Sequence, residues 1–266
     1  MTKRALKRMA REGEFNTADF DDKVRRLPVD RGGWTPHGHG AHGNAHGGYG
    51  GIHGENRDQS YVKNIKAKSD GQAALIKAID AKNLVVALGP AGTGKTYLAI
   101  AKAVEALEAG RVGRIVLSRP AVEAGESIGF LPGDMEDKLA PYLRPLYDAL
   151  SDRLSMKRVK ALIAEGLIEI APVGYMRGRT LNNAFVVIDE AQNCTYVQLK
   201  MLLTRLGWHS TMVVTGDPHQ TDLLPELSGL ADIATKLEQL NEVSVVRLAE
   251  QDIVRHPLVA SMIGVI

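Results

Sequence analysis

The stretch GPAGTGKT, residues 89–96, contains the residue types that wrap phosphate groups. Its form, G-x-x-x-x-G-K-[ST], lets backbone N–H groups close around phosphate oxygens, and the helical pattern that follows adds the partial positive charge of a helix N-terminus. We expect Lys95 to reach the β- and γ-phosphates of ATP and the Thr96 hydroxyl to bind Mg²⁺. The other residues expected to surround the nucleotide are Gly89, Pro90, Ala91, Gly92, Thr93 and Gly94.

A second group of reactive side chains follows the apolar run in FVVIDEAQN, residues 185–193. If the run is a parallel strand, Asp189 and Glu190 stand at its carboxyl end, where such sheets meet their ligands. Asp189 then suits Mg²⁺, through water, and Glu190 suits the base that orients or deprotonates the attacking water. Two acids after a strand can also be a simple helix cap, but behind a phosphate loop hydrolysis is favoured. Gln192 and Asn193 extend this polar edge, with Gln192 facing either the γ-phosphate or an adjoining segment.

A third polar turn, in VVTGDPHQTD at residues 213–222, follows another apolar run. Gln220 could bridge the γ-phosphate and the attacking water and so report which nucleotide state is present. Gly-Asp-Pro is also ordinary turn chemistry, so the turn alone would not indicate a site. The two carboxylates of the second group argue against a small-molecule kinase, because a kinase uses its substrate as the nucleophile. They favour hydrolysis.

The three groups need a scaffold that brings them together, and the pattern from residue 70 onward supplies one. Short apolar runs alternate with stretches of helical periodicity. Such alternation predicts an α/β fold, a mostly parallel sheet with helices on both faces. The expected strands lie at residues 83–89, 114–120, 167–172, 184–190, 210–217 and 242–248. The expected helices lie at residues 96–110, 134–150, 157–166 and 195–207, the second of them interrupted by two prolines.

The composition of the 266-residue chain sets further limits. Apolar residues make up 44%, enough for a sizeable core, and 33 basic residues nearly balance 31 acidic ones, so net charge alone does not require a nucleic acid partner. No apolar run reaches the roughly 18 to 20 residues that span a bilayer, and no membrane association is expected. The single cysteine, Cys194, excludes an intrachain disulfide and fits a reducing cytoplasm.

Residues 1–56 differ from the rest and are expected to form a basic tail and then a flexible segment, ahead of one folded domain at residues 57–266. The tail has no apolar region after its charges, so we expect no secretory signal; it is either a solvated helix or an arm that contacts nucleic acid. The segment RGGWTPHGHGAHGNAHGGYGGIHGEN is rich in glycine and has too few apolar side chains to offset the entropy of ordering. Its histidines could bind a metal opportunistically: His37, His39, His42, His46 and His53.

A phosphate loop followed by D-E-A-Q and then by G-D-x-x-Q is the motif order of superfamily 1 helicase cores. Longer blocks in the same order resemble the PhoH family of P-loop ATPases: GPAGTGKTYLA, RPAVEAGESIGFLPGD, PYLRPLYDAL, YMRGRTLNNAFVVIDEAQN, MLLTRLG, VVTGD, SGL and VRHPLV. They span roughly residues 70–260. The resemblance implies a three-layer RecA-like fold with ATP and Mg²⁺ as ligands. The turn GDPHQTDLL departs from the family's usual wording, and no nuclease domain of the PIN type precedes the ATPase, which puts nuclease activity within this chain in doubt.

The resemblance also implies roles for residues outside the three groups. Gln72 would read the adenine edge, although a surface glutamine is the plainer interpretation. Arg255 would act as an arginine finger, within its own subunit or across an interface, unless it forms a structural ion pair with Asp252. The neighbouring His256 suits a structural hydrogen bond better than catalysis.

Three more arginines are candidates for contact with nucleic acid phosphates. Arg119 ends an expected strand at the carboxyl edge of the sheet, and an ion pair with Glu123 or Glu126 is its alternative role. Arg177 and Arg179 lie in a glycine-containing loop before the D-E-A-Q run, where they could instead contact a γ-phosphate or remain in solvent. A loop of arginines also resembles the lid of a kinase.

One phosphate loop provides only one core, whereas superfamily 1 helicases place ATP between two. Either the chain alone hydrolyses ATP slowly, or a neighbouring subunit completes the site. The resemblance implies the second arrangement, a ring that is a homo-hexamer. Two functions fit the sequence. One is an ATPase that remodels or unwinds single-stranded RNA, alone or with a ribonuclease partner; the RNA link comes from the family's fusions to PIN nuclease domains. The other is a nucleotide-dependent switch for an RNA-processing partner, with little motor activity.

Overall fold

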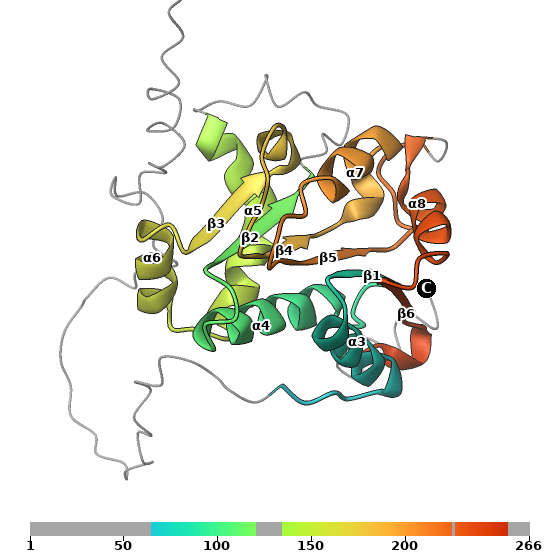
Figure 1. Cartoon of the computed structure of the whole chain (residues 1–266), viewed down its shortest axis with the longest axis horizontal. Coiled ribbons are helices and arrows are strands. Elements are labelled where there is room, and N and C mark those ends of the chain that lie inside the picture. The colour runs from blue at the N-terminus through green and yellow to red at the C-terminus, as the bar shows by residue number, and fades with distance from the viewer. Residues whose placement is uncertain (1–64, 121–134, 225–226, 255–266) are drawn as a thin grey trace, which may run out of the picture. The chain divides into compact units, whose positions relative to one another are not determined.

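The computed structural model of the chain describes residues 65–120, 135–224 and 227–254 (Figure 1). Several predicted features lie outside these residues: the tail and histidine-rich segment of residues 1–56, Glu123, Glu126, Arg255 and His256. The division of the chain into a tail and a domain at residues 57–266 stays a prediction.

A six-stranded sheet forms the centre of the described part, and every neighbouring pair of strands runs parallel. All six strands expected from the apolar runs are present: β1 (Leu84–Leu88), β2 (Arg114–Arg119), β3 (Ile168–Pro172), β4 (Ala184–Ile188), β5 (Thr211–Gly216) and β6 (Val243–Arg247). Their order across the sheet is β3-β2-β4-β5-β1-β6. The three polar groups follow β1, β4 and β5, which are neighbours, so the fold brings these groups side by side at one edge.

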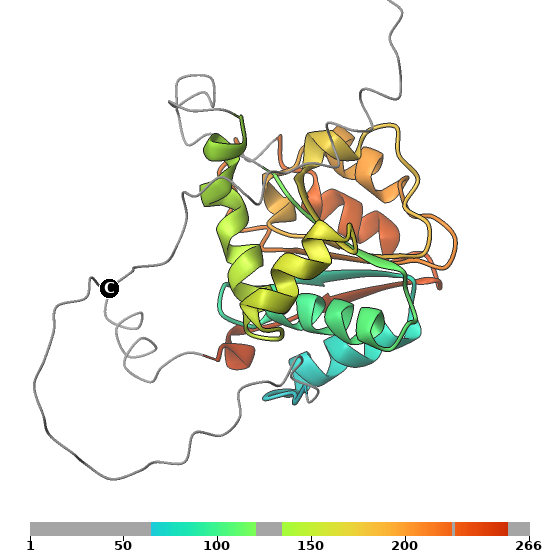
Figure 2. The same ribbon diagram turned by 90° about the vertical axis from the view of Figure 1, so that its left-hand side faces the viewer.

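Helices cover both faces of the sheet, as the alternation of elements predicted (Figures 1 and 2). One face carries α3 (Asp70–Ala81), α4 (Lys95–Glu108), α5 (Met135–Ser151) and α6 (Met156–Ala164), and the other carries α7 (Tyr196–Leu203) and α8 (Leu230–Leu237). Successive residues of a strand point to opposite faces. In β1, Val85 therefore packs in the core under α3 and α4, while Val86 packs in the core under α7 and α8. The result is the expected three-layer α/β fold of a P-loop protein.

Short polar residues cap the start of two helices, α3 and α7. The hydroxyl of Ser69 accepts a hydrogen bond from the Gln72 amide at 3.2 Å and caps α3. At the start of α7, Thr195 and Gln198 form a reciprocal capping box, with bonds of 3.3 and 2.8 Å. Such caps satisfy amides that have no partner within the helix. They set the position of α7 directly after the second polar group.

The prolines of α5 do not interrupt it, and that expectation was wrong. The helix runs without a break from Met135 to Ser151 through both Pro141 and Pro145. A proline inside a helix costs about 3 kcal/mol because it has no N–H, which removes one backbone hydrogen bond, and because its ring crowds the preceding turn. Leu146 and Leu150 of the same helix are fully buried, and their packing against the sheet offsets this cost.

The helices of the described ranges offer no candidate for a membrane span, since none combines the length and the apolar character that crossing a bilayer requires.

Candidate nucleotide-binding site

A pocket of about 310 Å³ opens at the carboxyl edge of the sheet, where β1, β4 and β5 end. The pocket is lined by residues of all three polar groups: Ala91, Gly92, Gly94, Lys95, Thr96, Tyr97, Asp189, Glu190, Gly216, Asp217 and Gln220. The strand order thus assembles segments that lie more than a hundred residues apart in the sequence.

The phosphate loop holds its lysine by backbone carbonyl groups. Lys95 is 8% exposed, and its Nζ donates to the carbonyl oxygens of Gly89 at 2.6 Å and Pro90 at 2.8 Å. Burial lowers the pKa of Lys95, while the nearby carboxylates Asp217, Glu190 and Asp189 act to raise it. A cation with so little hydration gains from a phosphate ligand, because few water contacts must be given up.

Two glycines of this loop are required by geometry. Gly89 has φ 143°, and a Cβ at this position would strike the carbonyl oxygen of Leu248. Gly94 has φ 84°, in the left-handed region that favours glycine, and starts α4 without a side-chain cap. Glycine at both positions lets the loop pass close to Leu248 and to Gln72.

Asp189 is held by two hydroxyl groups from two other segments. Its Oδ1 accepts hydrogen bonds from Thr96 at 2.6 Å and from Thr215 at 2.8 Å, and its amide donates to the Ser118 carbonyl at 2.8 Å. The carboxylate is only 2% exposed. A hydroxyl beside a carboxylate is a set of hard oxygen donors that fits Mg²⁺, which takes one or two protein ligands and completes its shell with water and phosphate oxygens. Thr96 and Asp189 would hold the ion.

Gln192 ties the second polar group to the third. Its Nε2 donates to Glu190 Oε2 at 2.5 Å, and its Oε1 accepts from the Asp217 amide at 3.1 Å. The backbone carbonyl of Gln192 accepts hydrogen bonds from the hydroxyls of Thr221 at 3.0 Å and Ser228 at 2.8 Å. Of the two roles considered for Gln192, the structure shows contact with an adjoining segment.

Arg119 lies against the two acids rather than on a separate loop. Its Nη1 is 3.5 Å from Asp189 Oδ2, and its Nη2 is 3.5 Å from Glu190 Oε1. The sequence predicted that Arg119 contacts a nucleic acid phosphate, with an ion pair to Glu123 or Glu126 as the alternative; the phosphate contact stays a prediction, and both glutamates lie outside the described residues. The partners seen here directly follow β4, the strand that pairs with β2.

A family model described as PhoH-like protein matches residues 64–266. The chain belongs to the PhoH-like family. A PhoH-like protein of Bacillus subtilis (strain 168) is 54% identical over 202 residues, which cover 76% of this chain and 63% of that protein. Protein PhoH of Escherichia coli (strain K12) is 46% identical over 205 residues, 76% of this chain and 58% of that protein. The chain therefore spans less than two thirds of the length of either relative.

Among solved structures, the large terminase of a thermophilic bacteriophage is similar over 74% of this chain and 49% of the terminase chain, with 12% identity and a TM-score of 0.47.

The other predicted site residues of this PhoH-like chain lie at different distances from the pocket. Gln220 lines it with an exposed side chain. Gln72 is instead buried beneath the phosphate loop, where its Nε2 donates to the Thr93 carbonyl at 3.0 Å and its Oε1 accepts from the Lys68 amide at 2.9 Å. The side-chain amide of Gln72 thus supports the loop in the structure. The contact of Gln72 with adenine stays a prediction.

The two arginines of the loop before β4 differ from each other. Arg179 forms a bidentate pair with Glu169, at 2.5 and 2.7 Å, and this hydrogen bonding raises the pKa of Arg179. Arg177 has an exposed side chain. Its neighbour Tyr175, on the short helix η2 (Val173–Met176), is 51% exposed. Neither arginine lines the nucleotide pocket.

Two contributors to the site were missed by the sequence reasoning. Tyr97 lines the pocket beside Thr96 and is 39% exposed, and its place directly after the phosphate-loop motif was the available signal. Thr215 reaches Asp189 from the end of β5, and only the strand order, which no local pattern contains, could have revealed this contact.

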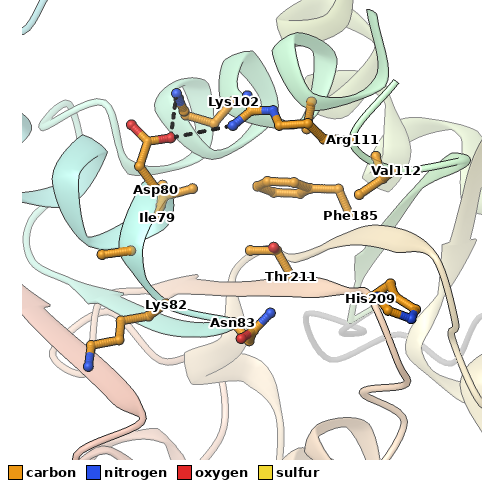
Figure 3. A pocket seen from close by; sticks show the side chains of 12 residues that line it. Ile79, Asp80, Lys82, Asn83, Lys102, Arg111, Val112, Phe185, His209 and Thr211 are labelled. Atoms are coloured by element: carbon orange, nitrogen blue, oxygen red, sulfur yellow. Dashed lines mark ion pairs between the residues drawn. The ribbon is translucent and has the colours of Figure 1, made fainter. Parts of the chain in front are cut away.

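A second pocket, of about 350 Å³, lies at the opposite edge of the sheet, where β4 and β5 begin (Figure 3). Figure 3 shows the ring of Phe185 between an ionic cluster and the side chain of Thr211. In the cluster, Lys102 pairs with Asp80 at 2.7 Å and with Glu105 at 2.7 Å. The pair with Asp80 joins α3 to α4, so we interpret the cluster as a support of the fold.

We predict that Gly216→Ala damages the candidate nucleotide-binding site. A Cβ at Gly216 would lie 2.6 Å from Leu230 Cδ2 and 2.7 Å from Gln192 Oε1, so Gln192 must move and release Glu190. We expect the free energy of unfolding to fall by about 1 to 3 kcal/mol, the usual cost of an added methyl group in a well-packed region. ATP turnover should fall as well. Urea unfolding and a phosphate-release assay measure the two effects.

The matched control is Gly174→Ala, because a Cβ at Gly174 meets no atom within 4 Å. Equal stability of the two variants would show that the packing around Gly216 is looser than the structure indicates.

Proposed function

We propose that this chain hydrolyses ATP and couples the hydrolysis to the remodelling of RNA. The observation that carries the hydrolytic part is the contact of Thr96 with Asp189 at 2.6 Å, with Glu190 next along the chain. It supports a magnesium site in the pocket that the phosphate loop and Glu190 also line. A binding site for nucleotide alone would not need the second carboxylate.

Each residue has a separate task in this proposal. Lys95 and the loop amides bind the phosphates, and Thr96 and Asp189 hold Mg²⁺, which when bound neutralises charge on the phosphate oxygens. Glu190, which lines the pocket with a side chain that is 37% exposed, takes up or orients a proton of the attacking water. Gln220 lines the same pocket and would contact the γ-phosphate or that water.

The RNA part of the proposal is supported by the surface beyond β3. Tyr175 and Arg177 are both exposed there and follow the carboxyl end of a strand, the same edge as the nucleotide pocket. An aromatic ring with a neighbouring arginine suits single-stranded nucleic acid, since bases stack on the ring and phosphates pair with the cation. The family's fusions to PIN nuclease domains favour RNA and a ribonuclease as partner.

A nucleotide-dependent switch is the second candidate function. The observation that favours it is the hydrogen bond from the Val254 amide to the Gly92 carbonyl at 3.0 Å. The bond ties the segment that leads to Arg255 directly to the phosphate loop. A partner of that segment could therefore respond to bound ATP with no motor activity at all.

We also propose that the protein works as a homo-oligomer, a hexamer. Within the described residues, the arginine nearest the two acids is Arg119, and it is already paired with both of them. A cation from elsewhere would then have to stabilise the charge of the transferring phosphate, a contribution of about 10³ to 10⁵ in rate where it has been assigned. Arg255, or Arg177 of a neighbour, is the candidate.

Of the predictions that follow from the proposed function, the first separates binding from turnover. Lys95→Ala should abolish ATP binding, because it removes the phosphate clamp, whereas Glu190→Gln should bind ATP normally and turn it over about 10² to 10⁴ times more slowly. Calorimetric titration and phosphate release measure the two steps. Lys77→Ala and Glu165→Gln, at exposed positions, are the matched controls. Near-normal turnover by Glu190→Gln would show that another group activates the water.

A second prediction concerns RNA. Single-stranded RNA should raise ATP turnover of the unmodified protein, and Tyr175→Ala should weaken the response while basal turnover stays unchanged. Phosphate contacts are screened by salt, so the stimulation should decline steeply as salt rises. Lys77→Ala again serves as the control. An ATPase indifferent to RNA under all these conditions would transfer the proposal to the nucleotide switch.

The third prediction concerns assembly. Mass measurement in solution with ATP and Mg²⁺ should give a multiple of the 28.8 kDa chain, six for the proposed ring. Mixing Arg255→Ala subunits with Lys95→Ala subunits should restore some turnover that neither variant shows alone, because one subunit keeps the finger and the other keeps the phosphate clamp. A monomer that hydrolyses ATP at full rate would overturn the shared site.

A further inference from the structure

Arg119 holds a position that neither the proposed ATP binding nor the proposed RNA contact explains. It is the last residue of β2, the strand beside β4, and its side chain is 22% exposed. Its two terminal nitrogens face two different acids, Nη1 toward Asp189 and Nη2 toward Glu190, each at 3.5 Å. One planar guanidinium thus spans both carboxylates of the second polar group.

The two carboxylate oxygens of Glu190 have partners in two different segments. Oε1 faces Arg119, and Oε2 accepts from Gln192 Nε2 at 2.5 Å. Glu190 also has φ 51°, an uncommon backbone conformation for a residue other than glycine. Because the backbone turns sharply and both oxygens have partners, the direction of this carboxylate is fixed from two sides.

The two carboxylate oxygens of Asp189 also have different partners. Its Oδ1 accepts from the hydroxyls of Thr96 and Thr215, and its Oδ2 faces Arg119. The other nearby cation, Lys95, donates to carbonyl oxygens of the phosphate loop. Among the ion pairs of the described residues, Arg119 is therefore the cation that both acids share.

We propose that Arg119 is a positioning residue: with Gln192 it clamps the carboxylate of Glu190, one oxygen each, and it balances the charge of the two acids. The inference rests on the proposed ATPase function and adds a positioning residue to the same site. Arg119 does not line the nucleotide pocket, so it acts through Glu190. The arrangement needs arginine, because a lysine is a single point charge and cannot span two carboxylates with a flat fork.

The kinetic test compares Arg119→Ala with Arg119→Lys. We expect Arg119→Ala to lower kcat about 10- to 100-fold at saturating ATP, within the range of a displaced general base, and to leave KM and the Kd for ATP within about threefold. Arg119→Lys should restore only part of kcat. In the Glu190→Gln background, Arg119→Ala should cause little further loss, because the group that it positions is already disabled.

A second readout needs no turnover. We measure Tm of the nucleotide-free protein for the four members of the cycle Arg119→Ala and Glu190→Gln. Loss of Arg119 should lower Tm by about 2 to 4 °C, because the carboxylates of Asp189 and Glu190 then repel each other without a shared cation. This decrease in Tm should be smaller in the Glu190→Gln background, where one of the two negative charges is absent. Arg158→Ala, whose ion pair with Glu108 lies outside the pocket, is the control and should show no such coupling to Glu190.

Three outcomes would overturn the inference. Arg119→Ala with a raised KM and unchanged kcat would make Arg119 a phosphate ligand. Loss of RNA stimulation with unchanged basal turnover would make it a nucleic acid contact. Additive changes in Tm would show that Arg119 and Glu190 do not interact, while the proposed ATPase would stand. Absence of turnover in the unmodified protein would instead overturn the proposed function, and the cycle of Tm values would still decide the contact.

Discussion

The hydrogen bond between Thr96 and Asp189 is the contact on which the site depends. It joins the first turn of α4 to the end of β4 at 2.6 Å, and so fixes the phosphate loop relative to the acids. Thr215 donates to the same oxygen and adds the end of β5. A parallel sheet makes this meeting possible, because it places three strand ends at one edge. If these strand ends were displaced, each motif would keep its sequence and lose its partners.

The opposing charges at this edge are arranged so that each has a defined partner. Lys95 is turned onto loop carbonyls, and Arg119 is turned onto both acids. Gln192 adds a neutral bridge that ends on the Asp217 amide. Buried polar networks of this kind specify one arrangement when every group is satisfied. The same network makes the edge sensitive to small changes of shape, since Gly216 has no room for even one methyl group.

Sequence pattern sufficed for the strands and for the three polar groups, because each depends on neighbours in the chain. Apolar runs such as that of β4 indicate burial directly, and the phosphate loop is recognised by its own spacing. The partners of Arg119 depended on β2 lying beside β4, which is a property of the sheet order. The direction of Gln72 depended on how α3 packs under the loop. Pro145 in α5 shows the converse, because tertiary packing overrode a strong local preference.

The tie between the phosphate loop and the segment at Val254 has a thermodynamic consequence. The Val254 amide bonds to Gly92, and Asp252 of the same segment accepts from the amides of Gly71 and Ala249 at 3.2 and 2.8 Å. Residues 252–254 therefore connect the loop to the start of α3. Linkage between two binding events is reciprocal. A molecule that binds this segment and shifts the loop must change the affinity of the protein for nucleotide by some factor. Bound nucleotide must then change the affinity of the protein for that molecule by the same factor.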